Sequence, residues 1–66
     1  MNLRINGETR ATTGAQNIAQ LMAELGLAPR TVMVEHNGTA LRPNEWDERT
    51  LAEGDVLEIV RIVAGG

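Results

Sequence analysis

The chain ends in Ala64-Gly65-Gly66, directly after a long apolar segment. Glycines have no side chains, so this end can be threaded through a narrow channel and approached closely from all sides. Its terminal carboxylate is ionised at neutral pH, because the pKa of an α-carboxyl group is near ~3.5. A carboxylate is a poor acyl donor, but adenylation by ATP would convert it into an anhydride that a sulfur or amine nucleophile can attack. The tail is therefore expected to be a substrate of another protein. The alternative is a frayed terminus that takes part in no reaction.

Side chains elsewhere offer little for catalysis. His36 is the one histidine and lies beside Asn37-Gly38, so it is expected to be a solvent-exposed turn residue with no cysteine or ligand cluster nearby. The acidic pair Asp47-Glu48 predicts a solvated loop, and Glu53 with Asp55 predicts a turn whose carboxylates cap the local backbone. We therefore expect neither a catalytic residue nor a metal site.

The composition argues against a self-contained enzyme. The chain has 66 residues, no cysteine and one tryptophan, which allows a single domain with a thin core. Without cysteine there can be no disulfide and no zinc site built from cysteine ligands. Ligand clefts are typically ~300–1,000 Å³ and would consume a core of this size.

Charge and hydropathy exclude further classes of protein. The net charge is -3 and the six basic residues are scattered, which disfavours binding to nucleic acid. No apolar run approaches the ~20 residues that span a bilayer. The segment Met1-Asn2-Leu3-Arg4 lacks the pattern of a signal peptide. We expect a cytoplasmic protein without nucleic-acid or membrane partners.

Two Asn-Gly pairs predict two β-hairpins. Asn6-Gly7 and Asn37-Gly38 suit the positive φ angles of two-residue hairpin turns. The flanking segments alternate apolar and polar residues, as half-buried strands do. The strands that these turns join are expected at residues 2–6, 8–12, 31–36 and 39–42.

A short helix is expected at residues 18–25. Asn17 suits the N-cap, Gln20 stands in the capping-box position, and Gly26 suits the residue just after the helix. One face carries an apolar stripe typical of a helix that packs on a sheet. The stripe consists of Ile18, Leu21, Met22 and Leu25.

Two later features raise the question of a partner surface. Residues 44–47 are expected to form a 3₁₀ turn that points Trp46 inward with Leu51, although tryptophan is also enriched at partner surfaces. The last strand, at 56–63, is apolar on both faces, which is typical of a central strand. If Leu57 and Ile59 face the helix, the opposite face exposes an apolar patch, unless a loop or neighbouring side chains cover it. That patch would consist of Val56, Val60 and Ile62.

The element order β-β-α-β-β-β predicts an α+β fold of the β-grasp type. The economical arrangement is a mixed sheet of four to five strands with the helix on one face and the last strand central, parallel to the first. Residues 1–63 would form this domain, and residues 64–66 would form a flexible tail.

Taken together, the segments resemble the ubiquitin-like sulfur carriers, and within them the thiamine-biosynthesis sulfur carriers of the ThiS family. The resemblance covers the whole chain. No single segment is specific, but their order and the chain length together are. The segments are Leu3-Arg4-Ile5-Asn6-Gly7, Leu25-Gly26-Leu27, Val34 to Gly38, Arg42-Pro43-Asn44-Glu45-Trp46, Glu53-Gly54-Asp55 and the terminal Gly65-Gly66.

The resemblance implies a protein co-substrate with no cofactor of its own. A ThiF-like adenylyltransferase would use ATP and magnesium to adenylate Gly66. Sulfur from a cysteine desulfurase would then replace AMP. The resulting thiocarboxylate would donate sulfur to a ThiG-like thiazole synthase, for the thiazole ring of thiamine. Gly65 and Ala64 would lie in the partners' channels. The docking face would comprise Val56, Val60 and Ile62.

Three other functions stay open on the sequence. The small subunit of molybdopterin synthase uses the same terminal chemistry, although the compact length favours the thiamine carriers. A ubiquitin-like modifier would be conjugated to lysines of its targets. A β-grasp binding module would dock a partner through its sheet and leave the tail inert.

Overall fold

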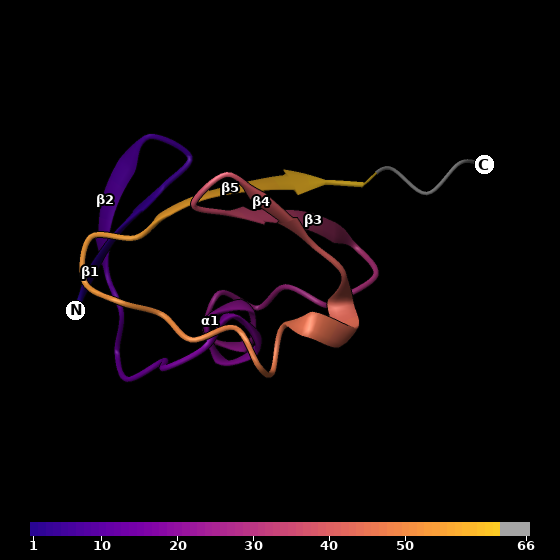
Figure 1. Cartoon of the computed structure of the whole chain (residues 1–66), viewed down its shortest axis with the longest axis horizontal. Helices are drawn as coiled ribbons and strands as arrows, with labels where there is room; N and C mark the ends of the chain where they lie inside the picture. Colours follow the sequence, from indigo (N-terminus) through magenta and orange to yellow (C-terminus); the bar gives the residue numbers. More distant parts are fainter. Residues whose placement is uncertain (63–66) are drawn as a thin grey trace.

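Residues 1–62 form a five-stranded sheet with one helix packed against it, and they are the part of the chain that the computed structural model describes. The elements lie along the chain in the expected order (Figure 1). Their ends lie within two residues of the expected ones, and several coincide with them. They are β1 (Asn2–Ile5), β2 (Glu8–Ala11), α1 (Ile18–Glu24), β3 (Val32–His36), β4 (Thr39–Leu41), the 3₁₀ helix η1 (Pro43–Glu45) and β5 (Val56–Arg61).

β5 lies at the centre of the sheet, as its apolar sequence predicts. The strand order is β2-β1-β5-β3-β4. β5 runs parallel to β1 and antiparallel to β3. Helix α1 packs on one face of this mixed sheet (Figure 1). The predicted two-layer β-grasp architecture is therefore confirmed.

Both predicted Asn-Gly turns are present. Asn6 and Asn37 each have φ 50°, and the following Gly7 and Gly38 have φ 82° and 87°. Positive φ at both central residues defines the turn type that matches the twist of a hairpin. The chain thus reverses at these two points because of local sequence.

Helix α1 begins and ends close to the expected residues. The Asn17 side chain accepts a hydrogen bond from the Gln20 N–H at 2.8 Å. The Gln20 side chain accepts one from the Gln16 N–H, one residue before the partner in a standard capping box. At the other end, the Leu27 N–H donates to the Met22 carbonyl at 2.8 Å. Seven residues form the helix, so its packing on the sheet supplies much of its stability.

The core lies between α1 and the sheet. Leu57 of β5 is fully buried, and Trp46 and Leu51 are 3% and 5% exposed. The expectation that Trp46 belongs to the core is confirmed, and the alternative of a partner-surface tryptophan does not hold. The buried hydrophobic residues are Leu3, Ile5, Ala15, Ile18, Leu21, Met22, Val32, Val34, Leu41, Trp46, Leu51 and Leu57.

The expectation that His36 is a solvent-exposed turn residue is wrong. His36 is the last residue of β3 and is 4% exposed. It alternates with the buried residues Val32 and Val34, so its ring lies on the core side of the sheet.

Candidate functional site

The sheet face opposite α1 carries exposed apolar side chains. Val56, Val60 and Ile62 are 44%, 60% and 43% exposed, whereas Leu57 between them is fully buried. Among the described elements, α1 covers only the other face (Figure 1). The predicted facing of β5 is therefore confirmed, and no described loop or side chain buries these three residues.

A residue on the neighbouring strand extends this surface. Met33 of β3 is 57% exposed and lies directly opposite Val60 in the antiparallel register. We call Met33, Val56, Val60 and Ile62 the outer patch. Met33 was not among the predicted patch residues, although its alternation with Val32 and Val34 indicates the outer face.

A groove of about 160 Å³ overlaps the outer patch at Met33 and Val60. Two of its lining residues carry like charge, because Glu35 of β3 faces Glu58 of β5 in the same register. Within residues 1–62 neither carboxylate forms an ion pair or a side-chain hydrogen bond. Like charges directly opposite each other destabilise a sheet. The groove is lined by Met33, Val34, Glu35, Ala40, Glu58 and Val60.

Sheet pairing continues to the last described residue. The Ile62 N–H donates to the Thr31 carbonyl at 2.8 Å, one residue beyond the end of β5 at Arg61. The predicted reactive residue Gly66 and the predicted channel residues Gly65 and Ala64 lie outside the described residues, as does Val63. Their roles remain predictions.

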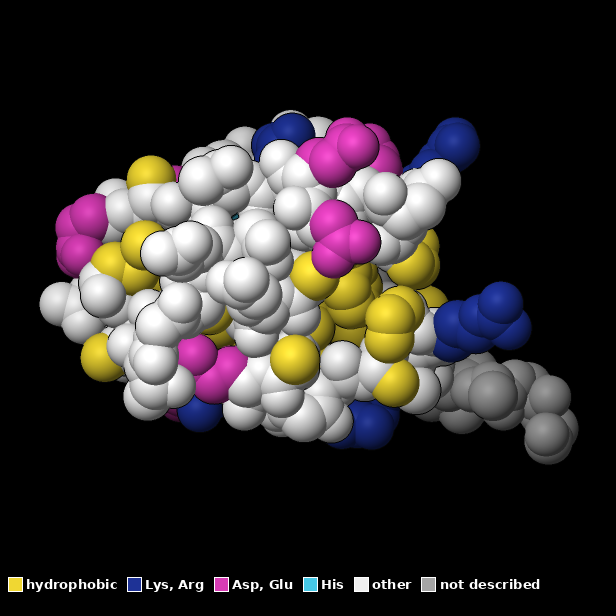
Figure 2. Space-filling view, turned by 90° about the horizontal axis from the view of Figure 1, so that it is seen from below, with side chains coloured by type: hydrophobic (Ala, Val, Ile, Leu, Met, Phe, Trp, Pro, Cys, Tyr) yellow, Lys and Arg dark blue, Asp and Glu magenta, His cyan; other side chains and the backbone are white. Residues whose placement is uncertain are grey.

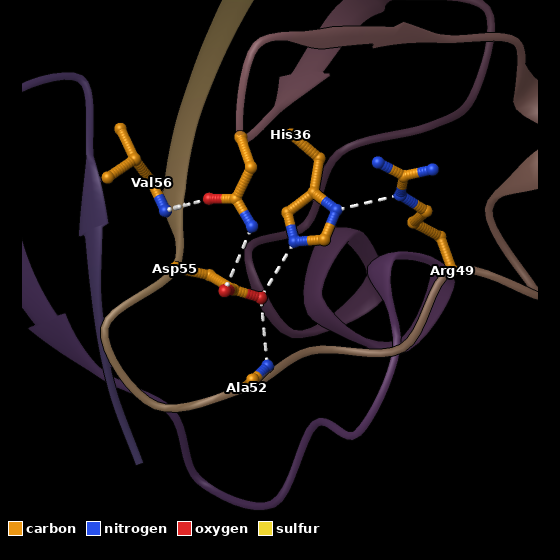
Figure 3. Close-up of polar contacts among 6 residues, drawn as sticks. His36, Arg49, Ala52, Asp55 and Val56 are labelled. Carbon is orange, nitrogen blue, oxygen red and sulfur yellow. Dashed lines mark hydrogen bonds and ion pairs between the residues drawn. The ribbon is translucent and has the colours of Figure 1, made fainter.

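His36, Asp55 and Arg49 form a polar cluster at the end of β3 (Figure 3). The Arg49 Nε–H donates to His36 Nδ1 at 2.9 Å. The ring proton therefore lies on Nε2, which donates to Asp55 Oδ2 at 2.7 Å. With both ring nitrogens engaged, the neutral His36 ring ties the loop that precedes β5 to β3.

The Asp55 carboxylate accepts further hydrogen bonds. Its Oδ2 accepts from the Ala52 N–H at 2.8 Å, which confirms the predicted cap of the local backbone for Asp55. The same prediction was wrong for Glu53, whose Oε1 accepts from the distant Asn2 N–H at 2.9 Å. The Asp55 Oδ1 accepts from the Asn37 side chain at 3.0 Å. Partial burial acts to raise the pKa of Asp55, but hydrogen bonds from Asn37, His36 and Ala52 outweigh it and hold the pKa below its ordinary value. The cluster offers no nucleophile and is structural.

The remaining surface of residues 1–62 shows no second site of a recognisable kind. Within residues 1–62, no three His, Asp, Glu or Cys side chains are grouped to hold a metal ion. No helix in this part of the chain is long and apolar enough to cross a membrane. Acidic and basic side chains are scattered over the face seen in Figure 2. The outer patch is therefore the best candidate surface in the described residues.

Comparison with known proteins relates the chain to one family. The sequence model of the ThiS family matches residues 3–66. The sulfur carrier protein ThiS of Thermus thermophilus is 34% identical over 62 residues, which cover 94% of this chain and 95% of that protein. The crystal structure of the thiamine biosynthesis protein ThiS from Geobacter metallireducens is 35% identical, covers 100% of both chains and has a TM-score of 0.82.

A longer relative contains a segment similar to the whole chain. The thiazole synthase of Paramagnetospirillum magneticum is 36% identical over 66 residues, which are 100% of this chain. The chain spans only 20% of the length of that relative. The family match, the near full-length carrier relative and the superposable structure agree with one another. This chain belongs to the ThiS family of β-grasp sulfur carriers.

Proposed function

We propose that the chain carries sulfur as a thiocarboxylate on Gly66 and donates it for thiazole formation in thiamine biosynthesis. The observation that carries this proposal is the similarity to a ThiS sulfur carrier over almost the full length of both proteins. The chain acts as a co-substrate, and the catalytic groups belong to its partners. Relatives named for thiamine biosynthesis favour this pathway over that of molybdopterin.

The chemistry needs two steps at the carboxylate of Gly66. In the first, a carboxylate oxygen attacks the α-phosphorus of ATP, and pyrophosphate leaves with magnesium bound to it. A ThiF-like adenylyltransferase would catalyse this step. In the second, the terminal sulfur of a persulfide formed by a cysteine desulfurase attacks the acyl carbon, and AMP leaves. A thiol then reduces the resulting acyl disulfide, which releases the thiocarboxylate and leaves a disulfide. ATP-dependent activation is consistent with a cytoplasmic location, which forms part of the proposal.

The outer patch would dock the partners that act on the tail. An apolar surface that no part of its own fold buries is a typical site of protein association. Val60 lies near the end of β5 that is nearer in sequence to the proposed reactive residue Gly66, and Ile62 directly follows that strand. A partner bound there would therefore meet the tail. Val56 and Met33 would enlarge the contact.

Thiazole synthase is the proposed acceptor of the sulfur. Its support is the relative named thiazole synthase that contains a segment similar to this whole chain. Two units joined in one polypeptide commonly serve one pathway. The acceptor enzyme would bind the outer patch and take the Gly65-Gly66 end into its active site.

Intact-mass spectrometry tests the proposed function. The chain is incubated with ATP, magnesium, a ThiF-like enzyme, a cysteine desulfurase, cysteine and a thiol reductant. We expect a mass increase equal to the exchange of one oxygen for one sulfur, and its loss after thiazole synthase is added with its substrates. A chain lacking Gly66 and a chain with one extra C-terminal alanine are the matched controls, and both should stay unmodified. An unchanged mass of the wild-type chain beside an adenylating enzyme shown to be active would overturn the proposal.

A further inference from the structure

The two Asn-Gly turns carry a sequence that is open to a covalent change. The backbone nitrogen of a glycine can attack the side-chain amide carbon of a preceding asparagine, because glycine has no side chain to obstruct it. Asparagine is accordingly among the thermolabile residues of proteins. Asn6-Gly7 and Asn37-Gly38 both have this sequence, and both asparagines have φ 50°. What distinguishes the two turns is the set of groups that their amides contact.

The Asn37 amide is bound to the polar cluster at the start of β5. Its Nδ2 donates to Asp55 Oδ1 at 3.0 Å, and its Oδ1 accepts from the Val56 N–H at 2.9 Å. The Asp55 carboxylate also accepts hydrogen bonds from His36 and Ala52. The amide of Asn37 is therefore held against the start of β5, and its nitrogen, the atom that deamidation removes, is bound to a carboxylate.

The Asn6 amide also makes two hydrogen bonds, but both are to the backbone. Its Oδ1 accepts from the Ile59 N–H at 2.7 Å, and its Nδ2 donates to the Ile59 carbonyl at 3.0 Å. Within residues 1–62 the Asn6 amide therefore has no charged partner. Deamidation at Asn6 would place an anion opposite a carbonyl, whereas deamidation at Asn37 would place it opposite another anion.

We propose that Asn37 is a modification site, where deamidation follows opening of the polar cluster and its product prevents the cluster from closing again. In the open state the Gly38 nitrogen forms a bond to Cγ of Asn37, and the bond from Cγ to Nδ2 breaks. Nδ2 leaves as ammonia and takes up the proton of the Gly38 amide. Water then opens the succinimide ring and gives aspartate or isoaspartate. This inference does not depend on the proposed function.

Neither product fits the place of Asn37. Aspartate puts an anionic oxygen where Nδ2 now stands, 3.0 Å from Asp55 Oδ1. Two carboxylates that share a site disfavour each other's charged form. Isoaspartate instead lengthens the backbone of a two-residue turn, and the length of a turn sets the register of its hairpin. Either product would therefore loosen the turn between β3 and β4 from the start of β5.

Peptide mapping by mass spectrometry tests the coupling between opening and reaction. The folded chain is kept at neutral pH, and the mass change from replacing the amide NH2 by OH is followed at both turns. Asp55→Ala should raise the rate at Asn37 at least about fivefold, because it removes the acceptor of Nδ2. Asn6 of the same molecules is the control for global unfolding, and its rate should stay within about twofold of wild type. An unchanged rate at Asn37, or an equal rise at both asparagines, would overturn the proposal.

A second pair of variants tests the consequence of the reaction. Asn37→Asp should raise the equilibrium constant for unfolding, measured with urea, at least about fivefold more than Asn6→Asp does. In the background of Asp55→Asn, the effect of Asn37→Asp should be smaller than in wild type, because an amide then faces the new carboxylate. Equal effects of Asn37→Asp and Asn6→Asp would overturn the proposal, as would an undiminished effect in the Asp55→Asn background.

Discussion

The two faces of β5 carry similar aliphatic side chains, but one face is buried and the other is exposed. Leu57 is fully buried under α1, whereas Val60, three residues further along the same strand, is 60% exposed on the outer face. Burial of an aliphatic side chain contributes roughly 1.5–3 kcal/mol to folding. Val60 gains little of this in the isolated chain. The difference shows that the core face of β5 stabilises the domain, and that the outer face is available to a partner.

The polar residues of the two faces follow the same division. On the core side, the His36 ring has partners at both nitrogens and Asp55 accepts several hydrogen bonds. On the outer side, Glu35 and Glu58 face each other without a cation bound to either within residues 1–62. The core side is satisfied within the chain. The two glutamates of the outer side have no such partner within residues 1–62.

The largest expected effect comes from truncating a core-facing side chain of β5. Leu57→Ala should lower the free energy of unfolding by about 2–5 kcal/mol, because it leaves a cavity at the centre of the core. Urea denaturation followed by the fluorescence of the buried Trp46 measures this loss. A loss below about 1 kcal/mol would contradict the central place of Leu57 in the core.

The next effect concerns the buried polar cluster and depends on pH. Since the pKa of Asp55 is lowered in the folded chain, its carboxylate contributes stability above its ordinary pKa of 3.8, and this contribution is lost as the pH falls through the folded value. Asp55→Asn should lower the free energy of unfolding by about 1–3 kcal/mol at pH 7, because it replaces the carboxylate that accepts the hydrogen bond from the His36 ring with a neutral amide.

Urea denaturation of both proteins over a series of pH values measures this effect. The stability of Asp55→Asn should fall less steeply than that of wild type below pH 3.8. His36→Gln provides a comparison that removes the ring but leaves Asp55 in place. Equal slopes for wild type and Asp55→Asn would contradict the role assigned to this carboxylate.

A smaller effect of opposite sign is expected on the outer face. Glu58→Gln should stabilise the free domain by about 0.2–1 kcal/mol, because it removes the repulsion from Glu35. Glu35→Gln should do the same. The double variant should gain no more than either single variant, because the repulsion needs both charges. Additive gains in urea denaturation would show that the two carboxylates do not interact.

Much of this division could be predicted from the sequence, because it follows from local patterns. Alternation along residues 56–62 gives the two faces of β5, and the Asn-Gly pairs give both hairpins. Each of these signals spans only a few neighbouring residues, and the local backbone conformation of those residues determines which way their side chains point and where the chain turns. The central position of β5 followed from its apolar character on both faces.

The contacts that depend on distant residues could not be predicted. His36 was expected at the surface because it lies beside the Asn37-Gly38 turn, and its partner Asp55 lies 19 residues away in the sequence. The hydrogen bond from the Asn6 side chain to Ile59 joins residues that are 53 positions apart, so no local sequence pattern predicts it. Only the folded sheet brings these groups together. Nevertheless, the alternation of Val32, Val34 and His36 was a usable signal for the burial of the histidine.

The division of β5 into a core face and a proposed docking face is tested most directly by Val60→Ala, the counterpart of Leu57→Ala. We expect its free energy of unfolding to stay within about 0.5 kcal/mol of wild type, because Val60 is exposed. Its affinity for thiazole synthase, measured by titration calorimetry, should fall about fivefold or more. An unchanged affinity, or a loss of stability as large as that of Leu57→Ala, would contradict the division.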